Sequence, residues 1–213
     1  GRRLEDDYIA QAVEIAMQLP DTPIKMIWQR EEDFTHDFPR PLAIAHARGT
    51  VKSGAVDAFD LSIAAPSVAE SSLARLRQPA IGPDVAIVAG AWDQPYSIPH
   101  YRVTGYRVPA MVPISSWRSV GASGNSFMHE SFFDELCHAA GTDPLPGRGR
   151  GVAFTLSFGV PVAEVIEVTQ TDQGIRIDRA FVAADVGRVL DPKNFEAQVQ
   201  GGVIFGLGHA MNC

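Results

Sequence analysis

The chain has 213 residues, a formal net charge of −7 and a pI near 5.3, and this acidic balance argues against a nucleic-acid-binding protein because no net positive field would gather phosphates. No apolar run approaches the ~20 residues that a membrane-spanning helix needs. The two cysteines, Cys137 and Cys213, are too few for a disulfide framework or a thiolate zinc site.

The first third of the chain combines one helical pattern with three strand patterns. Apolar residues between positions 9 and 17 follow the helical period, which predicts an amphipathic helix over residues 4–19. The short apolar run 23–30 predicts a strand. Residues 41–65 predict two further strands joined at Ser53-Gly54.

The middle of the chain alternates between irregular and regular patterns. Residues 66–100 are rich in Ser, Ala, Pro and Gly, which predicts irregular structure with one short helix near residues 67–77. A strand is expected at residues 100–108. A core-facing helix is expected after residue 124, and its apolar stripe consists of Met128, Phe132, Leu136 and Ala139, widened by Phe133 and Ala140.

The last third predicts a long hairpin followed by a helix. Two strands are expected at residues 151–169 and 174–184, with Gly174 supplying the turn between them. Asp191 followed by Pro192 predicts a helix start, in which the aspartate is the N-cap and the proline opens the first turn. The apolar stripe of this helix consists of Phe195, Val199, Val203, Leu207 and Met211.

This order of elements predicts an α+β fold, a two-layer α/β sandwich with a mixed or antiparallel sheet and helices on one side. A doubly wound parallel sheet is disfavoured because regular strand–helix alternation is missing. We expect two parts, residues 1–145 and residues 146–213, packed together as one compact unit. The second part holds the long hairpin and the final helix.

The segment SSWRSVGASG (115–124) places an arginine and small residues directly before a helix. Ordinary capping, with Ser123 as the N-cap, is one explanation. The alternative is an anion or cofactor cradle, in which backbone N–H groups and the forked donors of Arg118 face a negative ligand. The residues by themselves leave both explanations open.

Four glycines interrupt the final helix, at positions 201, 202, 206 and 208. Each costs ~1 kcal/mol relative to alanine inside a helix, so we expect the close approach of another backbone or of a ligand. Tight packing and ligand contact remain alternatives. Gln198 lies beside these glycines and is a candidate hydrogen-bonding partner for a polar cofactor.

The other polar clusters favour structural interpretations. The six histidines lack metal-ligand spacing, and His129 is expected on the surface of its helix. The charged residues within 30–41 predict a salt-bridged corner. GRGRG at 147–151 matches neither the P-loop nor the dinucleotide fingerprint and predicts a solvated loop. No serine, threonine or cysteine lies in a nucleophile-elbow pattern.

Several segments nevertheless occur in a recognisable order: GRRLEDDYIAQAVEIA, WQREEDFTHDFPRP, GAWDQPYSIPHYRV, SSWRSVGASGNSFMHESFFDELCHAAGTDPL, GRGRGVAF, SFGVPVAEVIEV and VAADVGRVLDPKNFEAQVQGGVIFGLGHAM. This ordered set, which covers nearly the whole chain, resembles the large (beta) subunit of isoquinoline 1-oxidoreductase-type enzymes. These belong to the molybdenum hydroxylases, the xanthine dehydrogenase and aldehyde oxidase family.

The resemblance implies a cofactor, a reaction and a partner. The cofactor is molybdopterin cytosine dinucleotide with molybdenum, and the reaction is hydroxylation of an aldehyde or an electron-poor N-heterocycle with oxygen from water. Electrons would pass to an iron–sulfur small subunit. The implied cofactor-binding residues are Trp117, Arg118, Ser119, Gly121 and Gln198. Val120 falls where relatives often carry an aromatic wall of the substrate pocket, so the resemblance implies a substrate-binding role for it.

The chain also departs from the family pattern. The catalytic glutamate of the family belongs to a Gly-Val-Gly-Glu-Pro motif that is absent here, and only Gly1 of the GGGFG loop is present, flanked by Arg2 and Arg3. The connection at residues 145–147 is shorter than in relatives. We therefore assign no catalytic residue and no metal ligand, and expect a fragment that lacks activity and cofactor when isolated.

Two other functions remain open at this stage. One is a stand-alone structural or interaction domain that keeps the fold without the cofactor, and the other is a small-molecule binder. A fragment of a larger subunit exposes surfaces that normally contact neighbours, so we expect that such a fragment can form a homodimer through them.

Overall fold

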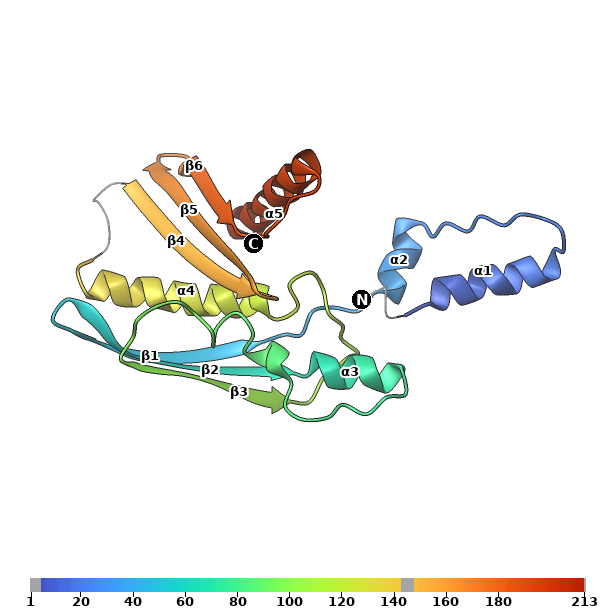
Figure 1. The fold of residues 1–213 in the computed structure, drawn as a ribbon, viewed down its shortest axis with the longest axis horizontal. Coiled ribbons are helices and arrows are strands. Elements are labelled where there is room, and N and C mark those ends of the chain that lie inside the picture. Colours follow the sequence, from blue (N-terminus) through green and yellow to red (C-terminus); the bar gives the residue numbers. More distant parts are fainter. Residues whose placement is uncertain (1–4, 143–147, 213) are drawn as a thin grey trace.

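The computed structural model describes residues 5–142 and 148–212, which form two three-stranded sheets with a long helix between them (Figure 1). The long helix is α4 (Ala122–Ala139), and it packs against β1 and β2 of one sheet and against β4 of the other. The α+β class is confirmed. The predicted boundary at residues 145/146 lies outside the described residues, and the division into two parts remains a prediction.

The first sheet has the order β1-β2-β3. β1 (Ile44–Lys52) and β2 (Ala55–Pro66) are antiparallel, and they are joined at Ser53-Gly54, where both residues have positive φ angles of 52° and 76°. β3 (His100–Val108) is parallel to β2. These three strands confirm the predictions, and the mixed pairing agrees with the predicted fold class.

The second sheet contains β4 (Arg148–Ser157), β5 (Val160–Thr171) and β6 (Gly174–Ala184), all antiparallel. The predicted single strand at 151–169 is wrong, because a tight turn at Phe158-Gly159 divides it into β4 and β5. Both turn residues have positive φ angles of 52° and 76°. The predicted loop at 147–151 is also wrong over its described residues, which belong to β4.

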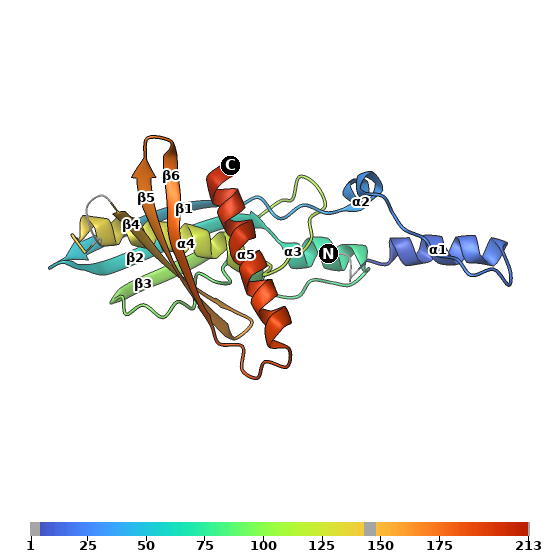
Figure 2. The same cartoon turned by 90° about the horizontal axis from the view of Figure 1, so that it is seen from above.

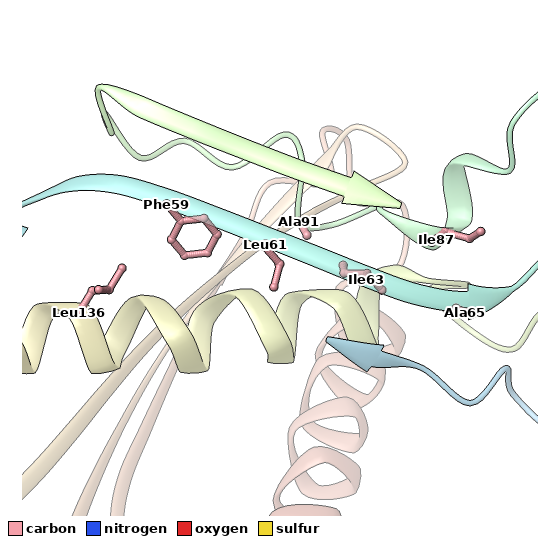
Figure 3. Packing of buried hydrophobic residues seen from close by; sticks show 7 residues of the cluster. All are labelled: Phe59, Leu61, Ile63, Ala65, Ile87, Ala91 and Leu136. Carbon is pink, nitrogen blue, oxygen red and sulfur yellow. The ribbon is translucent and has the colours of Figure 1, made fainter. Parts of the chain in front are cut away.

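The core of the first sheet lies between β2 and α4 (Figure 3). Phe59, Leu61 and Ile63 alternate along β2 and are 0–1% exposed, as the period of a half-buried strand requires. Leu136 of α4 meets them from the opposite side. Ala65 of β2, Ile87 from the short helix η1 (Val85–Ile87) and Ala91 complete the cluster. The predicted α4 stripe is confirmed at Leu136 and at Met128, Phe132 and Phe133, which pack against this cluster as partly buried residues. It is wrong at Ala139, which is exposed.

Glycine at position 49 allows α4 to lie close to β1. A Cβ atom on Gly49 would lie 2.7 Å from both the Ala58 carbonyl oxygen and Leu136 Cδ1. No side chain fits in that space, so the residue is required where strand and helix meet.

An arm formed by α1 (Asp7–Gln18) and α2 (Arg30–His36) extends away from the two sheets (Figures 1 and 2). The α1 prediction is confirmed, but the strand predicted at 23–30 is wrong. Its residues are not assigned to a strand and pair with neither sheet. The Trp28 indole instead donates to Gln11 Oε1 of α1 at 2.9 Å. Apolar, β-branched residues favour a strand only where a partner strand is within reach.

Two further helices follow their predictions. α3 (Val68–Arg75) begins after Ser67, whose hydroxyl accepts from the Glu70 backbone N–H at 3.0 Å. α5 (Pro192–Asn212) begins after Asp191, whose carboxylate accepts from the Asn194 backbone N–H at 3.1 Å. Four members of the predicted α5 stripe, Phe195, Val199, Val203 and Leu207, are partly buried, whereas the fifth, Met211, is exposed. Within residues 5–142 and 148–212, no helix is long and apolar enough to cross a membrane.

Candidate functional site

The Trp117–Gly121 loop joins the first sheet to α4 and reverses the chain in two adjacent left-handed residues. Ser119 has a φ of 69° and Val120 a φ of 52°. Gly121, not Ser123, is the N-cap of α4, and it makes no side-chain cap hydrogen bond. The capping explanation based on Ser123 is therefore wrong, because that residue lies inside the first turn of the helix.

Gly121 has a packing role that the sequence did not reveal. A Cβ atom at this position would lie 1.8 Å from the Ala86 carbonyl oxygen, so the loop backbone contacts the η1 backbone directly. Asn125, one turn into α4, donates to the carbonyl oxygens of Ala86 and Ala89 at 3.0 Å each. The N-terminus of α4 is therefore held against residues 86–89.

A second segment, residues 38–40, holds the other side of the loop. The Trp117 indole donates to the Phe38 carbonyl oxygen at 2.7 Å. The Arg40 guanidinium donates to the carbonyl oxygens of Arg118 and Val120. The salt-bridged corner predicted for residues 30–41 is wrong at Arg40, whose described partners are neutral oxygens. In α2, His36 Nδ1 lies 3.5 Å from Glu32 Oε1, a contact that is an ion pair only when the imidazole is protonated.

Arg118 and Gln198 meet across the gap between this loop and α5. Arg118 Nη1 donates to Gln198 Oε1 at 3.1 Å, although 80 residues separate them in the sequence. Both side chains are exposed. Among the described residues, no acceptor pairs with the other guanidinium N–H groups of Arg118 or with the Gln198 amide nitrogen. The two residues therefore present a shared set of exposed donors.

A small cleft of about 60 Å³ lies beside this loop. Its polar rim includes Arg40, Ser123 and Gly124, while Val120 and Met128 contribute apolar surface. In the described structure, the backbone N–H groups of Ser123 and Gly124 have no acceptor, as expected in the first turn of a helix. Such N–H groups and the positive end of the helix dipole favour an anion.

The glycine face of α5 does not meet the expected close neighbour. Cβ atoms added at Gly201, Gly202, Gly206 and Gly208 would encounter nothing within 4 Å among the described residues. Tight packing within the described chain therefore does not explain these glycines.

His129 of α4 lies in the core and not on the helix surface, so the prediction for this residue is wrong. The residue is 0% exposed and lies among Phe59, Tyr96 and Phe133, where a surface position was predicted. Its Nδ1 lies 2.9 Å from Glu130 Oε1. Its Nε2 is buried without a partner in the described part of the chain.

Glu130 beside it connects three parts of the fold. Its Oε2 accepts from the Tyr96 hydroxyl at 2.6 Å and from the Phe154 backbone N–H of β4 at 3.1 Å. Burial raises the pKa of Tyr96, and the Glu130 carboxylate adds to this rise. Tyr96 therefore stays protonated and remains a donor. Over the described ranges, no group of three or more His, Cys, Asp or Glu side chains could hold a metal ion.

Two family models, both described as molybdopterin cofactor-binding domain, match the chain. One matches residues 5–151 and the other residues 101–212, and both matches include the Trp117–Gly121 loop. Arg118 lies in both matched regions, and Gln198 lies in the second. The resemblance noted in the sequence is thereby confirmed at the level of the family.

Two curated relatives match almost the whole chain. The B subunit of nicotinate dehydrogenase from Pseudomonas putida is 26% identical over 259 residues, covering 96% of this chain. The beta subunit of isoquinoline 1-oxidoreductase from Brevundimonas diminuta is 25% identical over 251 residues, covering 99%. The chain spans only 22% and 32% of these two relatives. Both alignments are longer than the chain, so gaps open within it.

Proposed function

Because the chain belongs to the molybdopterin cofactor-binding domain family, we propose that its Trp117–Gly121 loop and Gln198 bind the anionic part of a molybdopterin. The observation that carries this proposal is the Arg118–Gln198 hydrogen bond. It brings together the two segments that the sequence singled out independently, and it leaves donors of both side chains exposed.

The donor chemistry of the site fits such a ligand. A guanidinium presents a planar fork that matches phosphate oxygens, and an exposed amide adds a neutral donor. The first turn of α4 contributes N–H groups, and Val120 and Met128 in the neighbouring cleft add a small apolar surface. Trp117 and Ser119 shape the loop, while Gly121 provides its close approach to η1.

The finer assignment is also a proposal. The cofactor form is molybdopterin cytosine dinucleotide with molybdenum, which supplies the redox chemistry for hydroxylating an aldehyde or an N-heterocycle with oxygen from water. The names of both relatives refer to N-heterocycles, nicotinate and isoquinoline, which favours that substrate class. Val120 contributes to the substrate side of the site, where a short side chain leaves room for a ring.

The chain acts as part of a larger assembly in this proposal. Each of the two relatives is named as a single subunit of its enzyme. We propose an iron–sulfur small subunit as the electron-accepting partner of the parent enzyme. No described residue is assigned to proton abstraction from water or substrate, so the isolated chain is proposed to be inactive.

A cofactor-retention experiment tests the proposal. The chain is produced in a host that makes molybdopterin, and released pterin is measured by fluorescence and molybdenum by mass spectrometry. A longer polypeptide that carries both flanking regions is treated in parallel. We expect pterin in the longer protein and its loss in the Arg118→Ala variant. Pterin-free protein in both forms, with each well folded, would refute the proposal.

A second candidate function is an interaction domain without a cofactor. Ile204 and Phe205 of α5 are 70% and 64% exposed, and they lie beside the open glycine positions. Such a surface suits a protein neighbour, including a second copy of the chain. Sedimentation of the purified chain distinguishes the two: a pterin-free dimer favours this second function, whereas a pterin-loaded longer protein favours the first.

A further inference from the structure

The Trp117–Gly121 loop holds a backbone conformation that its residues do not favour. Ser119 and Val120 are consecutive left-handed residues, and neither is glycine. A β-branched residue with positive φ is rare because its Cβ substituents crowd the following carbonyl. Such conformations persist only where the surrounding structure fixes them. Contacts from outside the loop must therefore hold it.

Arg40 makes those contacts from a distant part of the sequence. Its Nη2 donates to the Arg118 carbonyl oxygen at 3.0 Å, and its Nη1 donates to the Val120 carbonyl oxygen at 3.2 Å. Nη1 also donates to Ser123 Oγ at 3.1 Å. The two carbonyl groups lie on either side of Ser119, so one guanidinium bridges the reversed turn and ties it to α4.

The neighbours of Arg40 in the sequence and in space hold its backbone beside the loop. It stands between Pro39 and Pro41, and a residue that precedes proline is biased toward an extended backbone. The Pro39 carbonyl oxygen accepts from the Ser115 backbone N–H at 3.2 Å. The Arg40 guanidinium carbon lies 5.7 Å from the centroid of the Trp117 ring. Residues 38–40 therefore run beside residues 115–120 as a fixed support.

We propose that Arg40 is the positioning residue of this loop. By bridging the carbonyl groups of Arg118 and Val120, it holds the left-handed turn and keeps the Arg118 side chain within reach of Gln198. The role of Arg40 in holding the loop does not depend on a cofactor. The consequence of that role for cofactor binding rests on the proposed function.

Amide hydrogen exchange followed by NMR tests the proposal on the 213-residue chain. The probes are the Val120 and Ala122 backbone N–H groups, which donate within the turn at 2.8 and 2.9 Å, and the Trp117 indole. The Trp28 indole, bonded to Gln11, is the internal reference. The variants are Arg40→Met, Arg40→Lys and Val120→Gly, with Arg179→Met as a control that removes an exposed arginine from β6.

We expect Arg40→Met to accelerate exchange at the loop probes by about tenfold or more, with the Trp28 indole unchanged, because opening is local. Arg40→Lys should restore part of the protection, since lysine can reach one carbonyl but cannot bridge both. The effect of Arg40→Met should be smaller in the Val120→Gly background, where glycine adopts the left-handed turn without strain.

Three results would overturn the proposal. The first is loop exchange in Arg40→Met no faster than in Arg179→Met. The second is equal acceleration at the Trp28 indole, which would indicate general destabilisation. The third is an Arg40→Met effect of the same size in the wild-type chain and in the Val120→Gly background.

Pterin retention in the longer polypeptide, measured on Arg40→Met, separates this proposal from the proposed function. If wild type retains pterin, the positioning role predicts a loss in Arg40→Met with partial recovery in Arg40→Lys. If wild type retains none, the proposed function fails, while the exchange data still decide the role of Arg40.

Discussion

Arg118 Nη1 and Gln198 Oε1 lie 3.1 Å apart and connect the loop before α4 to the second turn of α5. This hydrogen bond places residues from opposite ends of the match over residues 101–212 in one exposed donor set. Neither side chain is buried, so the pair contributes little to the stability of the fold. The hydrogen bond instead fixes the orientation of the Arg118 guanidinium.

The first prediction separates binding from stability at Arg118. Arg118→Ala should change the free energy of unfolding by no more than about 0.5 kcal/mol, because the side chain is exposed. Pterin retention by the longer polypeptide should fall by about tenfold or more, since a hydrogen bond to a charged group contributes roughly 1.5–3 kcal/mol. Urea denaturation and released-pterin fluorescence measure the two effects.

Arg179→Ala is the matched control for this prediction, since it removes an exposed arginine from β6. It should leave both quantities unchanged. Parallel losses of stability and pterin in Arg118→Ala would contradict a binding role. Gln198→Glu should also reduce retention without unfolding the chain, because a carboxylate beside Arg118 would occupy the guanidinium and repel an anion.

The second prediction concerns two glycines three residues apart. Gly121→Ala should destabilise the chain by about 1–3 kcal/mol or more, as overpacking does, because the new Cβ would lie 1.8 Å from the Ala86 carbonyl oxygen. Gly124→Ala should instead stabilise it by about 0.5–1 kcal/mol, since that helical position has open space around it. Thermal unfolding of both variants measures the contrast. Similar effects of the two substitutions would show that the loop does not pack closely against η1.

The third prediction tests the buried connection made by Glu130. Glu130→Ala should cost about 3–5 kcal/mol, because it removes the acceptor of Tyr96 and Phe154 and leaves His129 buried beside no carboxylate. Asp134→Ala, one turn along α4 where the side chain is exposed, should stay within about 0.5 kcal/mol of wild type. Chemical denaturation compares the two. A Glu130→Ala cost near that of Asp134→Ala would mean that the network is not formed in solution.

The fourth prediction follows from a charge trio across the first sheet. Asp60 of β2 is in register with Arg48 of β1 and Arg102 of β3. Hydrogen bonds from Arg102, and then from Arg48, lower the pKa of Asp60 from its ordinary 3.8 to about 2. A carboxyl group whose pKa is lowered by folding stabilises the protein above its ordinary pKa, and this contribution is lost as the pH falls through the folded value.

Asp60→Asn should therefore lower Tm near neutral pH, and the difference from wild type should close as the pH falls from about 4 to about 2. Asp57→Asn is the control, because its carboxyl lies on the same strand outside the trio. Calorimetry at several pH values measures both. A Tm difference for Asp60→Asn that stays constant over this range would contradict the role of the two arginines.

The sequence predicted those elements whose ends are set by local chemistry. Gly54 marks the β1–β2 turn, and Asp191 followed by Pro192 marks the start of α5. The β4–β5 turn was missed because Phe158 is not a turn-forming residue, although it adopts a positive φ angle there. The strand predicted at residues 23–30 failed because local propensity does not report the absence of a partner strand.

The candidate site was predictable only in part, because its contacts join residues that are far apart in the sequence. Arg118 and Gln198 were identified individually from a loop pattern and from a glycine-rich helix, and their contact across 80 residues required the fold. Arg40 was missed, because its partners Arg118, Val120 and Ser123 lie 78 to 83 residues away. Its position between Pro39 and Pro41 is the signal that could have indicated a rigid backbone at this residue. His129 was misplaced because a polar residue next to the apolar stripe is normally exposed.

The last prediction concerns the glycines of α5, whose helical positions are open on the side where a Cβ would lie. In the 213-residue chain, Gly202→Ala and Gly206→Ala should each stabilise the helix by up to ~1 kcal/mol, because alanine has the higher helix propensity and meets no neighbour. In the longer polypeptide the same substitutions should reduce pterin retention, since the added methyl groups would fill a contact face. Thermal unfolding of the chain measures the expected gain in stability, and released-pterin fluorescence of the longer protein measures the expected loss of pterin. Stabilisation in both proteins with unchanged pterin would show that the glycine face contacts neither ligand nor neighbouring backbone.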